Sequence, residues 1–309
     1  MAVEQTKPAS IPKPATVSHR IFSPGRVWAL ALNTLTELIR LKIFYFLLIF
    51  ALLLIGSSAF LLQFSFQDQF QMLKDLSLGA MSIFTSLLAI LATSGLLPKD
   101  IEDRTLYTIL AKPVSRLEYL MGKLCGVVLL LLVAMVTMGA MFAVVLVWRS
   151  HIVRNEILAS GASQEDIAQQ LLDLHATAFN PNLWAGGLVI YTKACLLASM
   201  TLFISTFASS SLFTIIVSVV VYFIGHLQST ARDYWQASKS LAGVGVLTKT
   251  FLAVVAVVFP DFQLFNLVDE IVVGTAVAPA LLLKTLGLGV AYFFVYLLAA
   301  FFVFSSKEL

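Results

Sequence analysis

Charged residues are scarce in this chain, and their scarcity indicates its class. Only 12% of the 309 residues are charged, whereas 59% are hydrophobic and the mean hydropathy is +0.93. A soluble domain contains about 25% charged residues. The composition therefore excludes an ordinary soluble domain and predicts an integral membrane protein. The net charge of +3 is small and gives no reason to expect a nucleic-acid partner.

The chain also lacks the motifs of common catalytic and metal sites. Cys125 and Cys195 lie inside apolar runs, which favours small buried side chains over a disulfide or a thiolate metal site. The histidines are widely scattered, and neither HExxH nor GxSxG occurs. Gly122-Lys123 has no glycine five residues earlier, so it is not a phosphate-binding loop. We therefore expect no catalytic residue, no metal ligand and no cofactor bound by this chain.

Long uncharged stretches are the dominant feature that is present. A transmembrane helix needs about 20 apolar residues. Residues 43–67, 76–98 and 124–148 carry no formal charge, and a longer stretch from 194 to 225 is divided by serines near 205–211. The predicted fold class is an all-α membrane protein with six transmembrane helices, at about 43–64, 77–97, 116–148, 183–206, 210–227 and 285–306.

Segments outside these spans complete the predicted layout. Residues 1–22 contain prolines and no apolar core, which predicts a disordered cytoplasmic tail instead of a signal peptide. From Pro24 apolar residues recur at helical spacing, which predicts an N-terminal interfacial helix, although an early start of the first span is the alternative. Ser163 begins a helix-capping pattern and predicts a short outer helix. Between 228 and 283, apolar runs interrupted at Pro260 and Pro279 predict re-entrant outer helices before the last span.

The distribution of Lys and Arg predicts the orientation. With the N-terminus inside, the inner segments carry about twice as many of these residues as the outer segments. We therefore expect both termini and the 98–115 loop to be cytoplasmic, in a multi-pass protein of the cell inner (plasma) membrane.

The best-defined local motif is the polar segment 99–123. Residues 100–110 can form one helical segment, which Pro113 ends. Ser115-Arg116-Leu117-Glu118 is a capping box, so the next span is expected to begin around Arg116. Gly122 and Gly126 form a small-xxx-small pair that indicates close helix packing. A solvated loop that obeys the positive-inside rule would explain the basic residues, but not the acids, the helical pattern and the cap together.

The run from Leu97 to Arg116, followed by Tyr119, Gly122 and Lys123, resembles the permease subunits of ABC-2 type transporters. It is most similar to the branch related to the permease of the nitrous-oxide-reductase copper-maturation system and to gliding-motility permeases. Asp100 stands where Glu is commoner in that family, and Arg104 stands where Gly is frequent.

This resemblance implies a permease subunit without its own nucleotide site. It would work with two cytoplasmic ATPase subunits, which bind ATP and Mg, and with a second permease copy or a paralogue. The 98–115 segment would be the coupling helix that docks on the ATPase, where its charges would steer and orient the contact. The residues at the matching positions, which would couple to the ATPase, are Asp100, Glu102, Arg104, Thr105, Pro113 and Arg116.

Lys193 is a second candidate site, because a charge inside a span is functional by default. It is a candidate for the translocation path, and the alternatives are snorkelling or an ion pair with an outer acid such as Asp173 or Asp261. The leading hypothesis is export of an unidentified substrate. One alternative is an ATPase-driven mechanotransmitter that acts on an extracytoplasmic partner, and another is an ATPase-independent membrane scaffold.

Overall fold

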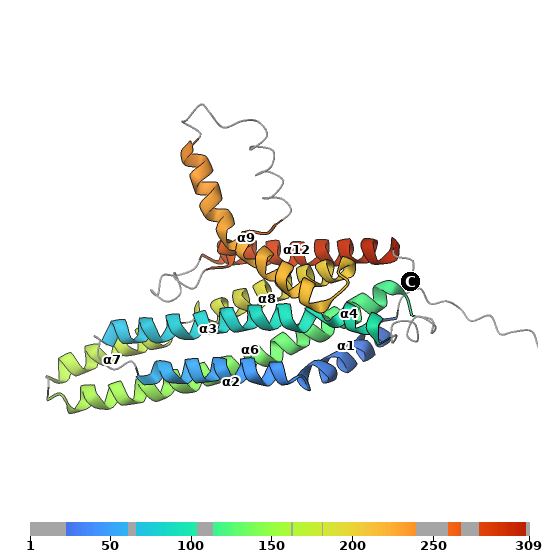
Figure 1. Cartoon of the computed structure of the whole chain (residues 1–309). Coiled ribbons are helices and arrows are strands. Elements are labelled where there is room, and N and C mark those ends of the chain that lie inside the picture. The colour runs from blue at the N-terminus through green and yellow to red at the C-terminus, as the bar shows by residue number, and fades with distance from the viewer. Residues whose placement is uncertain are drawn as a thin grey trace, which may run out of the picture.

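The computed structural model describes residues 23–60, 66–103, 114–161, 163–180, 182–238, 259–266 and 278–306, and within these ranges every regular element is a helix (Figure 1). The α-helices are α1 (Pro24–Ile39), α2 (Lys42–Ser57), α3 (Phe66–Ser94), α4 (Leu96–Glu102), α6 (Arg116–Ala159), α7 (Gln164–Ala178), α8 (Asn182–Phe207), α9 (Ser211–Ser238) and α12 (Pro279–Ser306). Two short 3-10 helices, η1 (Ser58–Phe60) and η2 (Phe262–Phe265), complete the described elements.

The helices have the length and surface of a multi-pass membrane protein. Five helical stretches are long and apolar enough to cross a membrane, and the number is six if the bent pair α1–α2 forms one span. The number reaches the predicted six only if α1, which was predicted to be a separate interfacial helix, is counted with α2, because α2 has 16 residues and ends at Ser57. Large apolar side chains are exposed on the outside of the bundle, among them Phe46, Val144, Leu212 and Phe302. Water would disfavour so much exposed apolar surface, whereas lipid chains cover it without cost.

Helix α1 lies along the beginning of α6. A Cβ atom at Gly122 would lie 2.5 Å from Leu30 Cβ, and one at Gly126 would lie 2.6 Å from Thr34 Cβ. The close helix packing predicted from this glycine pair is therefore confirmed. Because positions 30 and 34 meet 122 and 126 in the same order, α1 and α6 run in the same direction here. The chain then bends by 69° between α1 and α2.

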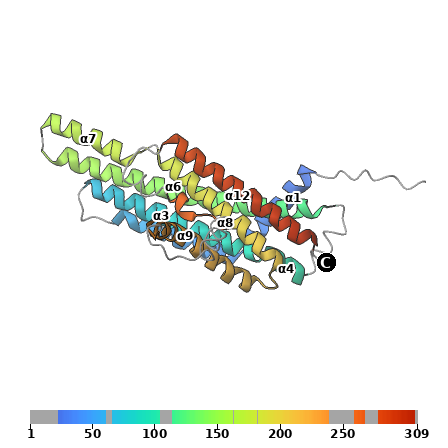
Figure 2. The same ribbon diagram turned by 90° about the horizontal axis from the view of Figure 1, so that it is seen from above.

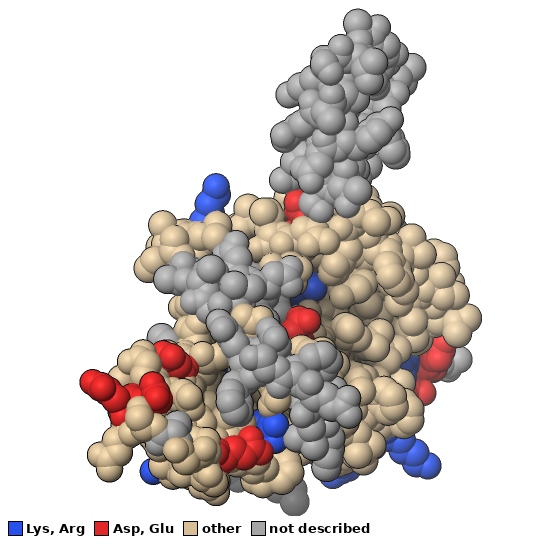
Figure 3. Space-filling view, turned by 90° about the vertical axis from the view of Figure 1, so that its left-hand side faces the viewer, with Lys and Arg blue, Asp and Glu red and all other residues tan. Residues whose placement is uncertain are grey.

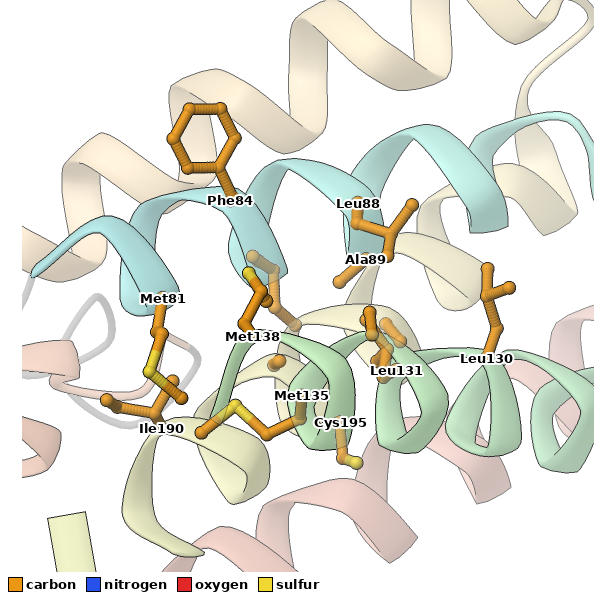
Figure 4. Packing of buried hydrophobic residues seen from close by; sticks show 14 of the residues in the cluster. Met81, Phe84, Leu88, Ala89, Leu130, Leu131, Met135, Met138, Ile190 and Cys195 are labelled. Atoms are coloured by element: carbon orange, nitrogen blue, oxygen red, sulfur yellow. The ribbon is translucent and has the colours of Figure 1, made fainter. Parts of the chain in front are cut away.

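The apolar core lies between α3, α6 and α8, and α12 packs along α8 (Figure 2). Figure 4 shows Met81 and Leu88 of α3 beside Leu131 and Met138 of α6, with Ile190 of α8 next to them. All five side chains are buried. This three-helix core fixes α3, α6 and α8 relative to one another, which positions the polar groups that they carry.

Helix α6 begins at the predicted capping box. The Ser115 hydroxyl accepts the Glu118 N–H at 3.2 Å, and the Glu118 carboxylate accepts the Ser115 N–H at 2.9 Å. The helix continues to Ala159, beyond the predicted span 116–148, and its 44 residues make it about 66 Å long. That exceeds the roughly 30 Å of a bilayer's hydrocarbon core. Gly161, at φ 67°, then turns the chain towards α7.

The two ends of the bundle differ. One end holds α1, α4, the start of α6 and the end of α12, and the opposite end holds the α6–α7 turn (Figures 1 and 2). We call the first the α4 end and the second the α7 end. Figure 3 looks at the α7 end, where charged side chains are separated by broad areas of uncharged residues. Ser163 caps α7 by accepting the Asp166 N–H at 3.2 Å, as the capping pattern predicts.

Helix α9 extends to Ser238, although the span predicted there ends near 227. After it, η2 returns to the bundle. Phe262 contacts Gly225 of α9 so closely that a Cβ there would lie 2.3 Å from its ring. A Cβ at Gly289 of α12 would lie 2.6 Å from Thr192 Cγ2 and 3.0 Å from the Phe265 ring. Both phenylalanines are fully buried. The rest of the predicted re-entrant region, 239–258 and 267–277, lies outside the described residues.

Candidate functional site

The predicted coupling segment is described at its two ends. Helix α4 follows α3 after a one-residue break at Gly95, and it ends at Glu102 with Asp103 as its C-cap. The single helix expected from 100 to 110 therefore ends at Glu102 in its described part. Glu102 and Asp103 are exposed. Arg104, Thr105 and Pro113 lie outside the described residues, and the chain is described again from residue 114.

Asp100 points inward and belongs to a polar group, partly buried and partly at the surface, that we call the α4 cluster; its members are Glu37, Lys99, Asp100, Tyr119 and Lys123. The Lys123 ammonium lies 2.7 Å from Asp100 Oδ2 and 3.8 Å from Glu37 Oε2. The Tyr119 hydroxyl donates to the same Asp100 oxygen, Oδ2. Lys99 pairs with Glu37 at 2.8 Å near the surface. Asp100 is 7% exposed and Lys123 is 4% exposed, so this pair is largely removed from solvent.

Glu118 joins the start of α6 to the start of α1. Its carboxylate is fully buried, and besides the Ser115 N–H it accepts the Ser23 N–H at 2.6 Å. Arg26 lies 3.2 Å from the same oxygen atom. One carboxylate therefore caps α6, holds the first residue of the described N-terminal region and carries an ion pair. This agrees with the interpretation of Glu118 as a cap.

Arg116 joins the start of α6 to the end of α12. Its guanidinium donates to the carbonyl oxygens of Phe304 at 3.0 Å and Ser305 at 2.7 Å, and it lies over the Phe304 ring. Tyr119 stacks on the same ring at 6.0 Å between centroids. A cation at a helix C-terminus also interacts favourably with the helix dipole. Arg116 thus bonds within the chain instead of projecting freely towards solvent.

The α4 end therefore combines side chains that bond within the bundle, which we call the frame, with a short exposed edge at the end of α4. Asp100 and Arg116 belong to the frame, whereas Glu102 belongs to the exposed edge. Sequence reasoning did not connect Glu37, Tyr119 and Lys123 to Asp100. These residues come from three helices that are distant in sequence, and no local spacing indicates which charges will meet.

Lys193 occupies a separate buried group between α3, α8 and α9. Its ammonium lies 3.3 Å from Ser82 Oγ and 3.2 Å from His226 Nε2, and it is 5.5 Å from the centre of the Tyr222 ring. It is 4% exposed, so it does not snorkel to the surface. Among the described residues it forms no ion pair with Asp173 or Asp261. The sequence did not indicate His226 as a partner of Lys193, because His226 belongs to α9 and residue spacing within α8 carries no information about it.

No group of three or more His, Cys, Asp and Glu side chains that could hold a metal occurs within the described ranges. In comparisons with known proteins, no family model and no curated protein matches this chain. The functional argument therefore depends on the residues themselves and on the family resemblance of the 97–123 region.

Proposed function

We propose that the chain is the permease subunit of an ATP-binding-cassette transporter, which couples ATP hydrolysis by two separate ATPase subunits to export of a substrate. A second permease copy or a paralogue completes the membrane part. The proposal places the α4 end in the cytoplasm and the protein in the inner (plasma) membrane. ATP and Mg belong to the ATPase partner, and this chain has no enzymatic step of its own.

The observation that carries the proposal is the attachment of the 98–115 segment at both of its ends. Asp100 ties the first end to α6 through Lys123, and Arg116 ties the second end to α12. A segment fixed at both ends to several helices transmits displacement to those helices, whereas a loose loop would absorb it. This favours coupling over a solvated loop.

Individual residues then take different roles in the proposal. Glu102 is exposed at the end of α4 and is the described residue best placed to contact an ATPase. Asp100 and Arg116 are positioning residues, because their side chains bond within the bundle. Arg104, Thr105 and Pro113 stay in the proposed contact on the strength of the resemblance. Helix α1, bent away from α2, is proposed to lie at the cytoplasmic interface.

The proposal is tested by purifying the chain with its ATPase. We expect the wild type to bring down a protein with a phosphate-binding loop, identified by mass spectrometry, and to stimulate its ATP hydrolysis. Replacing both Asp100 and Arg104 by Ala should leave the protein inserted but uncoupled. Reversing the exposed charge with Glu102→Arg should weaken the contact without disturbing the frame.

The matched control is Asp173→Arg, which reverses an exposed acid on α7 at the opposite end. It should leave the ATPase contact intact. If the Asp100/Arg104 variant and the Glu102 variant both retain a fully stimulated ATPase, the α4 end is not the coupling site and the proposal is wrong.

A mechanotransmitter is the second candidate, and the α6–α7 hairpin favours it. Helix α6 is about twice as long as a bilayer core is thick, so the hairpin extends beyond the membrane on the side opposite α4. Such a rigid projection suits mechanical work on an extracytoplasmic partner. Reconstitution in liposomes separates the two functions, because an exporter accumulates substrate with ATP whereas a mechanotransmitter hydrolyses ATP without accumulation.

A further inference from the structure

The Lys193 cluster, which we define as Lys193, Ser82, Tyr222 and His226, contains a buried cation with an unusual set of partners. An ammonium group has three N–H donors. Two of them have oxygen or nitrogen partners, at Ser82 Oγ and His226 Nε2. The Tyr222 ring provides a cation–π contact. All of these partners are uncharged when His226 is neutral.

The hydrogen bonds of His226 indicate its tautomer. Its Nδ1 lies 3.0 Å from the carbonyl oxygen of Tyr222, and a carbonyl oxygen can only accept. Nδ1 therefore carries a proton, which leaves Nε2 of the neutral ring as an acceptor for the Lys193 ammonium. His226 orients the ammonium in this arrangement but does not neutralise its charge.

No ion pair of the described part of the chain includes Lys193. Asp261, the buried acid that precedes η2, forms no ion pair with Lys193, and its Oδ1 accepts the Gln263 N–H at 3.0 Å. By comparison, the buried Lys123 has a carboxylate at 2.7 Å. A buried charge is costly unless a counter-charge accompanies it. An anion bound beside Lys193 would supply the counter-charge that this buried ammonium lacks.

Buried hydroxyl groups lie on the same three helices. Thr93 of α3, Thr201 of α8 and Ser218 of α9 each have a buried hydroxyl without a hydrogen-bond partner in the described structure. Thr201 and Ser218 are each eight residues from the cluster on their own helices, or about 12 Å. Since α9 runs opposite to α3 and α8, all three hydroxyls lie on the α4 side of the cluster. Buried hydroxyls normally bond to protein, water or ligand, so these three groups can accept a polar ligand or water on that side of the cluster.

We propose that Lys193, with the Ser82 hydroxyl and with its ammonium oriented by His226, binds a single anionic group, a carboxylate or a phosphate, on the molecule that this chain moves or senses. The anion-site proposal rests on the proposed transport or mechanotransmission function, which supplies the molecule that carries the anionic group. Phe262 of η2 covers the cluster, with its ring 5.6 Å from His226 and 5.8 Å from Tyr222. The hydroxyls on α3, α8 and α9 place the approach of the anionic group on the α4 side of the cluster.

The test uses the full chain, purified in a neutral detergent without any ATPase. Thermal unfolding is followed by tryptophan fluorescence at increasing concentrations of inorganic phosphate or of dodecyl phosphate. We expect at least one probe to raise the Tm of the wild type. Lys193→Gln should weaken the apparent affinity about tenfold or more, because it removes a charged hydrogen-bond donor. Lys193→Arg keeps the charge and should retain binding within a few-fold.

Lys74→Gln is the matched control. Lys74 is also a buried lysine, on α3, but it donates to the carbonyl oxygen of Thr177 at the α7 end. Its replacement should leave the phosphate dependence unchanged. A response to both probes indicates a free anion, and a response to dodecyl phosphate alone indicates an amphiphilic ligand or lipid headgroup; either result supports an anion site at Lys193.

The proposal is overturned if neither probe raises the wild-type Tm, or if Lys193→Gln responds as the wild type does. The same applies if Lys74→Gln abolishes the response as completely as Lys193→Gln. Because no ATPase is present, a negative result here leaves the coupling proposal standing. Conversely, failure of the Glu102 experiment leaves anion binding at Lys193 untouched.

Discussion

The buried pair Asp100–Lys123 allows a quantitative prediction about the α4 end. Lys123→Gln removes the ammonium that lies 2.7 Å from Asp100 Oδ2 and leaves the carboxylate buried beside the Tyr119 hydroxyl. Removing one partner of a buried ion pair costs about 3–5 kcal/mol. We therefore expect this variant to lose about 3–5 kcal/mol of unfolding free energy, because the remaining carboxylate is only 7% exposed.

Asp100→Asn should cost less. The Lys123 ammonium keeps a second acid, Glu37, at 3.8 Å, and the new amide oxygen still accepts a hydrogen bond. We expect a loss of about 1–3 kcal/mol, the cost of one weakened charged hydrogen bond. In the double variant no unpaired charge remains between the two positions, so its cost should be below the sum by about 1–3 kcal/mol.

The assay is reversible unfolding in mixed detergent–SDS micelles, followed by circular dichroism, for the wild type, both single variants and the double variant. Lys99→Gln is the control, because its ion pair with Glu37 is more exposed and should be worth about 0–1 kcal/mol. Equal costs for the two single variants, with additivity within about 0.5 kcal/mol, would refute the account of the α4 cluster as one energetic unit.

Three further predictions concern the same end of the bundle. Gly126→Ala should destabilise the protein by about 1–3 kcal/mol, since its Cβ would meet Thr34 at 2.6 Å. Gly79→Ala is the control and should be neutral or stabilising, because a Cβ there has no neighbouring atom within 4 Å. Unfolding in SDS compares the two variants. Glu118→Gln should cost about 1–3 kcal/mol, because an amide cannot accept from both N–H groups and also neutralise Arg26, and Glu118→Ala should cost more in that assay. Asp103→Cys, in a background without the two native cysteines, should react with an impermeant maleimide only from the cytoplasmic side, and labelling from outside would invert the proposed topology.

Local signals in the sequence predict local structure well in this chain. The Ser115 capping box depends on residues within a few positions, and it is present. The spacing of Gly122 and Gly126 also indicated a close helix approach, but it could not indicate that α1 is the partner. The polar break at Arg40 likewise coincides with the end of α1. Hydrophobic length also indicated an all-helical membrane protein. These features follow from backbone hydrogen bonding and lipid exposure, which act on each segment separately.

Features that depend on distant helices were not predictable in this way. Asp100 and Lys123 both lie in the polar segment 99–123. The contact of Lys123 with Glu37, however, joins residues that are 86 positions apart in the sequence. The partnership of Lys193 with His226 requires α8 and α9 to meet at one level. The extent of α9 to Ser238 was also missed, because polar residues after 227 suggested an end although they are compatible with a helix that leaves the membrane.

The α4 cluster and the Lys193 cluster are joined by the consecutive helices α3 and α4, which gives the proposed mechanism a physical route. Ser82 in α3 contacts Lys193, and Asp100 in α4 contacts Lys123. The 18 residues between them span about 27 Å along nearly continuous helix. Only Gly95 interrupts it, with φ −88° and ψ −9°, at the edge of the right-handed helical region. A displacement of α4 would therefore move Ser82 relative to α8, because a helix transmits axial motion with little loss. The proposed coupling at the α4 end and the proposed anion site at Lys193 would then be connected through α3, and a more flexible joint at Gly95 would weaken that connection.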